Sequence, residues 1–218
     1  MSPDPFHPTL LVLSAPTGGG KTTIGRRVVE ADGAIRFSVS HTTRAPRPGE
    51  RDGVDYHFVD EASFEAMAGR GEFLEWAQVH GRFYGTHRGE LDRAREGGWD
   101  LLLDIDVQGG LQVKEVDPSA VLVFILPPSV EVMLQRLGNR AEEPGFDLRR
   151  RMATAERELE LAQAYDYNVL NEDLDVAVGQ VRRILEASRL RAAGREAAGR
   201  RVREGVSAWL RGSNVRGG

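Results

Sequence analysis

The fold of this chain is decided by residues 10–23, which read Leu10-Leu11-Val12-Leu13-Ser14-Ala15-Pro16-Thr17-Gly18-Gly19-Gly20-Lys21-Thr22-Thr23. An apolar run typical of a buried strand ends at three consecutive glycines, and a lysine and two hydroxyl residues then lead into a helix. Glycines let several backbone N–H groups point at one phosphate, and the helix N-terminus adds its positive dipole. This order of features predicts a phosphate-binding loop rather than an ordinary glycine-rich turn.

The loop fits the pattern G-x-x-x-x-G-K-[ST] at Gly20, Lys21 and Thr22, whereas Ala15 stands in place of the first glycine. Lys21 is long enough to reach the outer phosphates of a nucleotide, and the Thr22 hydroxyl suits a Mg²⁺ ligand. We therefore predict that the whole loop binds phosphate. Its residues are Ala15, Pro16, Thr17, Gly18, Gly19, Gly20, Lys21, Thr22 and Thr23.

Composition limits the class of protein. A chain of 218 residues, 40% hydrophobic and 28% charged, is typical of a globular protein with one core and room for an inserted subdomain. The absence of cysteine excludes disulfides, thiolate catalysis and cysteine-ligated metals. A net charge of −4 argues against a nucleic-acid partner. Without a long apolar run or a signal-peptide pattern at its start, we expect no membrane association and a cytoplasmic location.

A short strand is predicted over residues 35–40, followed by a proline-rich loop over residues 40–50. Arg44 and Arg47 lie three residues apart in this loop. Two arginines on a loop can simply face solvent. Prolines stiffen this loop, however, so it loses less entropy when it holds two guanidinium groups on one anion. We therefore interpret the pair as a phosphate clamp.

The segment 39–96 is predicted to be a small, largely antiparallel β-rich insert between two halves of an α/β core. A period-two alternation over 54–59 is typical of a strand, residues 73–80 are predicted to form another strand, and a short helix is expected over 61–69. Continuous strand patterns of the kind found in a core sheet resume only after this segment.

Glu75 interrupts the apolar row of the strand over residues 73–80. A buried carboxylate is costly unless hydrogen-bond donors meet it. Glu75 is therefore either an edge-strand side chain facing water or a carboxylate that binds a ligand with paired donors. A glycine-flanked turn over residues 81–86 is expected to present Tyr84 and Thr86 beside it.

The core resumes with a buried parallel strand over residues 99–106, whose apolar run ends in two carboxylates. Asp104 and Asp106 lie on one face because side chains alternate along an extended chain. An aspartate after an apolar strand in a phosphate-loop protein suits the water shell of magnesium. Alternatively, either residue caps a helix expected over residues 107–116.

Strands and helices alternate through the remaining core. Further strands are predicted over 121–126 and 167–170. A helix is predicted over 129–137, and a mobile loop over 138–145. A long helix then runs from this loop to about residue 164, and a last helix begins after residue 173. Short connections favour a parallel sheet with helices on both faces. The residues expected to point inward from the helices are Val130, Met133, Leu134, Leu137, Leu148, Met152, Leu159, Ala162, Leu174, Val178, Val181 and Leu185.

From about residue 10 to residue 190 the sequence resembles the guanylate kinases. The most specific stretches are 40–50 and 53–56, and 72–76, 84–86, 104–109 and 125–129 are also similar. The resemblance implies transfer of the ATP γ-phosphoryl group to GMP with Mg²⁺, and GMP and ATP as small-molecule partners. It also implies a phosphate-loop core over 1–38 and 97–190, a GMP-binding insert over 39–96 and a lid at about 138–150. The tail over 191–218, rich in Arg, Gly and Ala, is expected to be a frayed, poorly ordered helix, with a partner-binding helix as the alternative.

The resemblance also implies roles for single residues. Those that match the family's GMP-phosphate ligands are Arg44, Arg47, Tyr56 and Tyr84. Those around guanine and its ribose are Ser40, Glu75, Thr86, Asp104 and Asp106. Lys21 and Thr22 match the family's residues for the ATP phosphates and magnesium. Asp104 matches a residue near the magnesium, which it contacts through water. The catalytic set implied is Lys21, Arg44, Arg136, Arg140 and Arg151. The lid departs from the family, because 140–145 read Arg-Ala-Glu-Glu-Pro-Gly where Arg-Gly-Thr-Glu is usual.

The chemistry of Glu75 supports guanine as the base that it binds, independently of the resemblance. Guanine presents N1–H and the N2 amino group side by side, so one carboxylate can accept from both. Adenine has an unprotonated N1 and no N2 amino group, and it would leave a buried charge unpaired. Two other functions stay open: a phosphate-loop kinase with another acceptor, such as AMP or a phosphorylated sugar, and a non-catalytic interaction module. Intact Lys21, Thr22 and Asp104 argue against the module, and the oligomeric state does not follow from the sequence.

Overall fold

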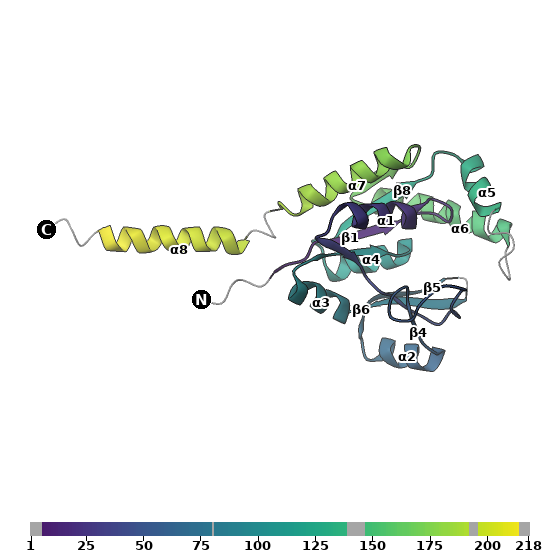
Figure 1. Ribbon diagram of the computed structural model, residues 1–218, viewed down its shortest axis with the longest axis horizontal. Coiled ribbons are helices and arrows are strands. Elements are labelled where there is room, and N and C mark those ends of the chain that lie inside the picture. Colours follow the sequence, from purple (N-terminus) through teal and green to yellow (C-terminus); the bar gives the residue numbers. More distant parts are fainter. Residues whose placement is uncertain (1–5, 80, 139–146, 192–195, 214–218) are drawn as a thin grey trace.

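The core of the protein is a parallel sheet (Figure 1). The computed structural model describes residues 6–79, 81–138, 147–191 and 196–213. Within them the sheet has five strands in the order β2-β7-β1-β8-β9, so β1 lies in the centre. The strands are β1 (Leu10–Ser14), β2 (Ile35–Phe37), β7 (Asp100–Asp104), β8 (Val121–Leu126) and β9 (Tyr167–Leu170). The predicted parallel core sheet is confirmed.

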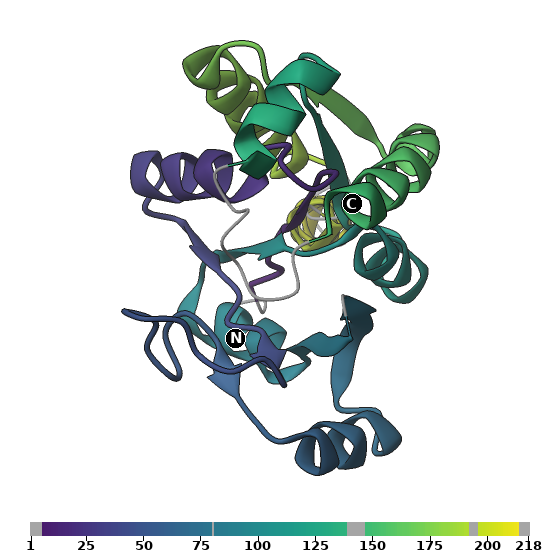
Figure 2. The same cartoon turned by 90° about the vertical axis from the view of Figure 1, so that its right-hand side faces the viewer.

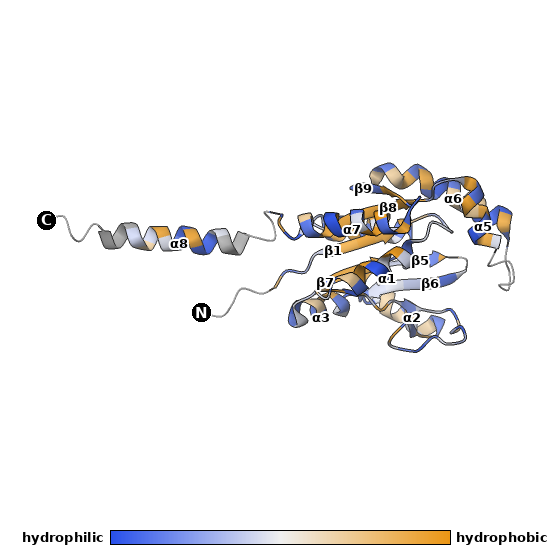
Figure 3. Cartoon of the chain, turned by 45° about the horizontal axis from the view of Figure 1, so that its top comes forward, coloured by the Kyte–Doolittle hydropathy of each residue, from blue (hydrophilic) through white to orange (hydrophobic). Residues whose placement is uncertain are grey.

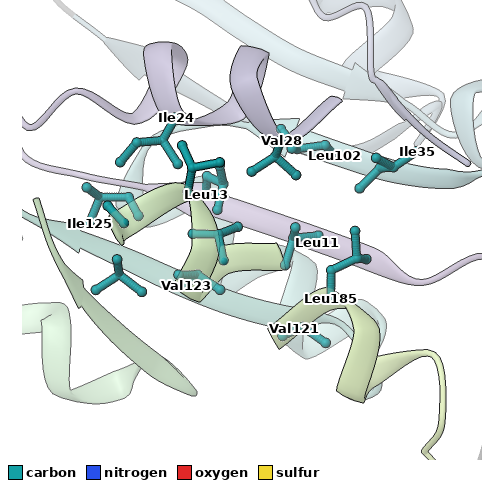
Figure 4. Close-up of a cluster of buried hydrophobic side chains, with 14 of the residues drawn as sticks. Leu11, Leu13, Ile24, Val28, Ile35, Leu102, Val121, Val123, Ile125 and Leu185 are labelled. Carbon is teal, nitrogen blue, oxygen red and sulfur yellow. The ribbon is translucent and has the colours of Figure 1, made fainter. Parts of the chain in front are cut away.

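Helices cover both faces of this sheet, as predicted, because β1 directs alternate side chains to opposite sides. One face packs against α1 (Lys21–Ala31) and α7 (Leu174–Ser188), and the other against α3 (Gly89–Gly97) and α4 (Val107–Val116). The first cluster, drawn in Figure 4, includes Leu11, Leu13, Ile24, Val28, Val123 and Leu185. The second includes Leu10, Val12, Ala94, Leu103, Val113 and Phe124. Figure 3 shows the hydrophobic strands enclosed between more polar helices.

Two further helices, α5 (Val130–Gly138) and α6 (Leu148–Glu160), lie at one end of the sheet, and a 3-10 turn (Leu161–Ala164) follows α6 (Figure 1). Three residues expected to point inward are exposed instead, namely Val130 (52%), Leu134 (39%) and Leu148 (42%). Because α5 lies at the margin of the core, only Met133 and Leu137 are buried on it. The predicted burial of Ala162 and of Val178, Val181 and Leu185 is confirmed.

The insert forms a second sheet in the order β4-β3-β6-β5 (Figure 2). Its elements are β3 (His41–Thr42), β4 (His57–Phe58), α2 (Glu61–Gly69), β5 (Phe73–Val79) and β6 (Arg82–His87). Pairing is antiparallel between β5 and β6 and between β3 and β6, but parallel between β3 and β4. Phe64 of α2 stacks between Phe73 and Phe83, at ring-centroid distances of 4.5 and 5.3 Å. The insert therefore has a small core of its own.

Several local predictions for the insert and its borders are wrong. Residues 82–86 form most of β6 rather than a turn, because they continue the antiparallel ladder with β5. The strand expected over 54–59 shrinks to β4, since Val54 and Asp55 turn back onto the Arg51 carbonyl. The strand from residue 35 stops at Phe37, and the Val39 N–H then donates to Glu90 of α3 at 3.0 Å. Helix α3 itself was not predicted.

One side chain of the core joins the edge of the insert sheet. The Gln112 amide of α4 accepts from the Trp76 N–H at 3.2 Å and donates to the Trp76 carbonyl at 3.0 Å. Trp76 belongs to β5, which is the edge strand beside α4. We refer to this pair as the Gln112 latch.

The tail contains a helix, as expected. Glu196–Ser213 forms helix α8, which Figure 1 shows apart from the rest of the described structure. Arginine, alanine and glutamate favour helix strongly enough to outweigh the glycines there. Its Val202, Val206 and Trp209 side chains are exposed. None of the described helices combines the length and apolarity needed to cross a membrane.

Candidate active site

The phosphate loop joins the end of β1 to the start of α1. Gly18 and Gly20 have φ values of 86° and 91°, a conformation that favours glycine. Gly19 is required for a different reason, because a Cβ there would lie 2.6 Å from the Ala15 Cβ. The alanine that replaces the usual first glycine is therefore accommodated by the absence of a side chain at position 19.

Lys21 and Thr22 both contact Asp104 at the end of the neighbouring strand β7. The Lys21 Nζ lies 2.8 Å from Asp104 Oδ1 and donates to the Ile105 carbonyl at 2.8 Å. The Thr22 hydroxyl donates to Asp104 Oδ2 at 2.6 Å. Burial opposes the charge of Lys21, but the Asp104 carboxylate outweighs that effect and raises the pKa of Lys21. The structure thus brings the loop lysine and the loop threonine to one carboxylate at the end of β7.

Two side chains from distant parts of the chain bind the carbonyls of the loop. Arg136 of α5 donates from Nη1 to Gly18 O and Gly19 O, each at 3.2 Å. Asn171, buried just after β9, donates from Nδ2 to Gly19 O at 2.9 Å. The sequence analysis named Arg136 but missed Asn171. Its position after a core strand was the available signal, since parallel strands point their carboxyl ends at ligands.

Glu75 is buried, with 4% of its surface exposed, so the reading of it as a solvent-facing edge residue is wrong. Its Oε1 accepts from the Thr86 N–H at 2.9 Å and from the Thr86 hydroxyl at 2.7 Å. Burial raises the pKa of Glu75 to about 7, and the nearby Asp106 carboxylate adds to the shift. Gly109 of α4 lies against the second oxygen, because a Cβ there would come 2.5 Å from Oε2.

The arginine loop carries a fixed ion pair. Arg44 donates to Glu50 Oε1 and Oε2 at 2.8 and 3.0 Å, and its guanidinium lies 5.3 Å from the ring centre of Tyr56. Glu50 also accepts from the Arg47 N–H at 2.7 Å. The Arg44 guanidinium is the largest cause holding the pKa of Glu50 below its ordinary value. The rings of Tyr56 and Tyr84 lie 6.1 Å apart in an edge-on arrangement.

One cleft of about 700 Å³ joins the phosphate loop to the insert. The predicted residues that line it are the loop 15–23 and Ser40, Arg47, Tyr56, Glu75, Tyr84, Asp104, Asp106, Arg136 and Arg151. Arg44 and Thr86 do not line it, since Arg44 faces Glu50 and Thr86 binds Glu75. Arg140 lies outside the described residues. Lining residues that the sequence analysis did not name include Glu158, Asn171 and Glu172.

The two aspartates after β7 differ in their contacts. Asp106 caps α4 by accepting from the Gly109 N–H at 2.8 Å, and it lines the cleft as well. Asp104 forms no such cap and instead faces Thr22 and Lys21. Among the described residues, no group of three or more His, Cys, Asp or Glu side chains is placed to hold a metal alone. Thr22 and Asp104 nevertheless offer adjacent oxygen atoms, the ligand type that Mg²⁺ prefers beside phosphates and water.

A parallel sheet with a phosphate loop, facing an inserted sheet across one cleft, defines a phosphate-loop enzyme of the nucleotide-kinase class. A family model described as Guanylate kinase matches residues 7–188. A guanylate kinase of Methylobacillus flagellatus is 46% identical over 182 residues, covering 84% of this chain and 90% of the relative. One of Paramagnetospirillum magneticum is 50% identical over 183 residues, covering 84% and 86%. The crystal structure of guanylate kinase from Anaplasma phagocytophilum superposes with a TM-score of 0.70 at 36% identity, covering 85% and 88%. The chain belongs to the guanylate kinase family.

Proposed function

We propose that this chain transfers the γ-phosphoryl group of ATP to GMP and releases ADP and GDP. The observation that carries the proposal is that a buried carboxylate, Glu75, and a complete phosphate loop line the same cleft. Phosphoryl transfer requires two substrates in line, neutralised charge and exclusion of water. A single cleft with a phosphate site at one end and a guanine-reading group at the other supports such an arrangement.

ATP is the donor, and the loop from Ala15 to Thr23 binds its phosphates. The N–H groups of the loop and the N-terminus of α1 stabilise phosphate charge. Lys21 lies beside them and moves from Asp104 to the outer phosphates. Thr22 and Asp104, the latter through water, would hold a magnesium ion, which would supply charge neutralisation at the phosphates.

GMP is the acceptor and binds to the insert, residues 39–96. Arg47, Tyr56 and Tyr84, which line the cleft, hold its phosphate, and Arg44 joins them by exchanging part of its ion pair with Glu50 for the phosphate. Glu75 accepts the two donors of guanine, while Thr86 fixes the carboxylate from behind. The remaining GMP contacts come from Ser40, Asp104 and Asp106.

The arginines at the other side of the cleft stabilise the transferring group. Arg136 and Arg151 bring positive charge to the phosphoryl oxygens from α5 and α6 as these helices close over the donor, and we propose Arg140, which lies outside the described residues, as the third cation. Arginine suits this role because its planar fork binds two phosphate oxygens at once. Closure also excludes water and so prevents hydrolysis of ATP.

The test is a coupled assay with ATP and each of the four nucleoside monophosphates. We expect GMP to be phosphorylated far faster than AMP, CMP or UMP. In the Glu75→Gln variant, kcat/KM for GMP should fall about 100-fold, because an amide places a donor against the guanine N–H groups, while KM for ATP stays unchanged.

Glu72→Gln is the matched control, since Glu72 pairs with Arg70 in the same insert at 2.6 Å and does not line the cleft. Equal activity with AMP and GMP would favour a different acceptor. No turnover with any monophosphate would favour a non-catalytic module.

A further inference from the structure

Glu158 is a cleft residue to which the proposed reaction gives no role. It lies on α6 seven residues after Arg151, which is two helical turns, so both side chains occupy one face of the helix. Both line the cleft. The Oε2 atom of Glu158 is buried and has no hydrogen-bond partner among the described residues. A buried oxygen of this kind is costly and calls for an explanation.

The groups around Glu158 place it on the phosphate loop. The backbone N–H of Thr17 and the ammonium of Lys21 favour its ionised form, whereas Asp106 at the start of α4 disfavours it. Tyr165, which follows the 3-10 turn, also lies near this carboxylate. Burial is the largest influence and raises the pKa of Glu158 to about 7. The carboxylate thus reaches from α6 to the first part of the loop.

We infer that Glu158 is a positioning residue that fastens α6 to the phosphate loop at Thr17, so that Arg151 is held over the phosphates of the donor. The inference rests on the proposed phosphoryl transfer. A helix fixed near its C-terminal end can pivot at its N-terminal end, where Arg151 lies. The contact with Thr17 sets the distance from Arg151 to the loop, and a misplacement of about 1 Å can cost about 100-fold in rate.

This role requires a hydrogen-bond acceptor at position 158 rather than a negative charge. Glu158→Ala removes the acceptor, so kcat should fall about 10- to 100-fold and KM for ATP should rise, while KM for GMP remains unchanged. Glu158→Gln retains an acceptor of the same length and should restore most of kcat. Glu156→Ala, on the exposed side of the same helix, is the control and should match the unaltered protein.

A double-mutant cycle separates positioning from mere stability. If Glu158 acts through Arg151, Glu158→Ala should lose most of its effect on kcat in an Arg151→Ala background. Equal effects in both backgrounds, a Gln variant as slow as the Ala variant, or a matching rise in KM for GMP would each overturn the inference. Thermal unfolding of every variant identifies loss of fold. The unaltered protein assayed with GMP tests the proposed function separately, since its activity does not depend on this inference.

Discussion

At the end of the core sheet where its strands begin, Asp100 and Asp32 share the guanidinium of Arg189. The Nε of Arg189 lies 2.6 Å from Asp100, its Nη1 lies 2.7 Å from Asp32, and the Thr9 N–H donates to Asp100 at 2.7 Å. At the opposite end, where the strands finish, Glu75, Glu158 and Asp106 line one cleft, and the Lys21 ammonium favours the ionised forms of Glu75 and Glu158.

The difference shows that the two ends of the sheet have different roles. The buried Asp100 and the half-buried Asp32 at the first end meet an arginine, which lowers the pKa of Asp32 and ties together the chain ends of α1, β7 and α7. Two carboxylates at the cleft have raised pKa values because burial is not offset by enough donors. The first arrangement stabilises the fold, whereas the second leaves binding capacity for ligands at a cost in stability.

Arg189→Met should have the largest effect on stability. The change leaves Asp100 buried without its cation, so the free energy of unfolding should fall by about 3–5 kcal/mol, with kcat unchanged in the molecules that stay folded. Urea unfolding measures the free energy of unfolding, and an assay at low temperature measures kcat. Arg27→Met is the control, because Arg27 forms an exposed pair with Asp175 at 2.7 Å and its loss should cost less than about 1 kcal/mol. Equal destabilisation by both would contradict the comparison.

Lys21→Met should give the reverse result, a loss of kcat rather than a loss of stability. Turnover should fall about 10²–10³-fold, because a preorganised cation at the phosphates is lost. The other lysine of the chain, Lys114, binds Asp166 at 2.9 Å and the Ala120 carbonyl at 2.7 Å, away from the cleft. Lys114→Met should lower stability and leave kcat intact. A large loss of kcat in the Lys114 variant would show that the two ends are not independent.

Gly109→Ala changes the packing around the Glu75 carboxylate and leaves the carboxylate itself unaltered. The new Cβ would lie 2.5 Å from Glu75 Oε2, so the carboxylate must move and kcat/KM for GMP should drop about 10-fold or more, with KM for ATP unchanged. Gly179→Ala in α7 is the matched helical glycine, because nothing lies within 4 Å of its added Cβ. That variant should gain about 0.5–1 kcal/mol in stability. Unchanged GMP kinetics in Gly109→Ala would disprove tight packing at Glu75.

The pH dependence should show the most gradual change in activity. Glu75 must be ionised to accept the guanine donors, and its pKa is about 7 in the free protein, so kcat/KM for GMP should fall about tenfold per pH unit below 7. The folded pKa lies above the ordinary value of 4.5, so the stabilising contribution of Glu75 is full below pH 4.5 and is lost as the pH rises through 7.

Glu75→Gln should therefore gain stability relative to the unaltered protein as the pH rises from 4.5 to 7. Urea unfolding at pH 5 and pH 8 measures this difference. A stability difference that stays constant between the two pH values would show that Glu75 has its ordinary pKa.

The sequence predicted features whose cause is local. The loop 15–23 lines the cleft as expected, because strand, glycines and Lys-Thr specify a phosphate site within fourteen residues. Apolar runs likewise located β1, β7, β8 and β9. Helix α3 was missed because Leu91 and Ala94 are the only apolar side chains in residues 89–97. Two such side chains are too few to define the apolar face of an amphipathic helix.

Features that depend on tertiary packing could not be predicted in this way. Glu158 looks like one of many charged residues on a polar helix until α6 is placed over the loop. Pairing alone decides that residues 82–87 are a strand. Arg44 was expected to face the acceptor phosphate, yet its orientation depends on Glu50, six residues away in a loop whose shape has no periodic signal.

The Gln112 latch has a consequence for the behaviour of the protein in concentrated solution. Strand β5 is an edge of the insert sheet, and unpaired backbone groups on such an edge can recruit a strand from another molecule. The Gln112 amide occupies the N–H and carbonyl of Trp76, and so blocks part of this edge. Two hydrogen bonds of about 1 kcal/mol each hold α4 against this edge. Residue 112 thus leaves one fewer pair of backbone groups on β5 open to a strand from another molecule.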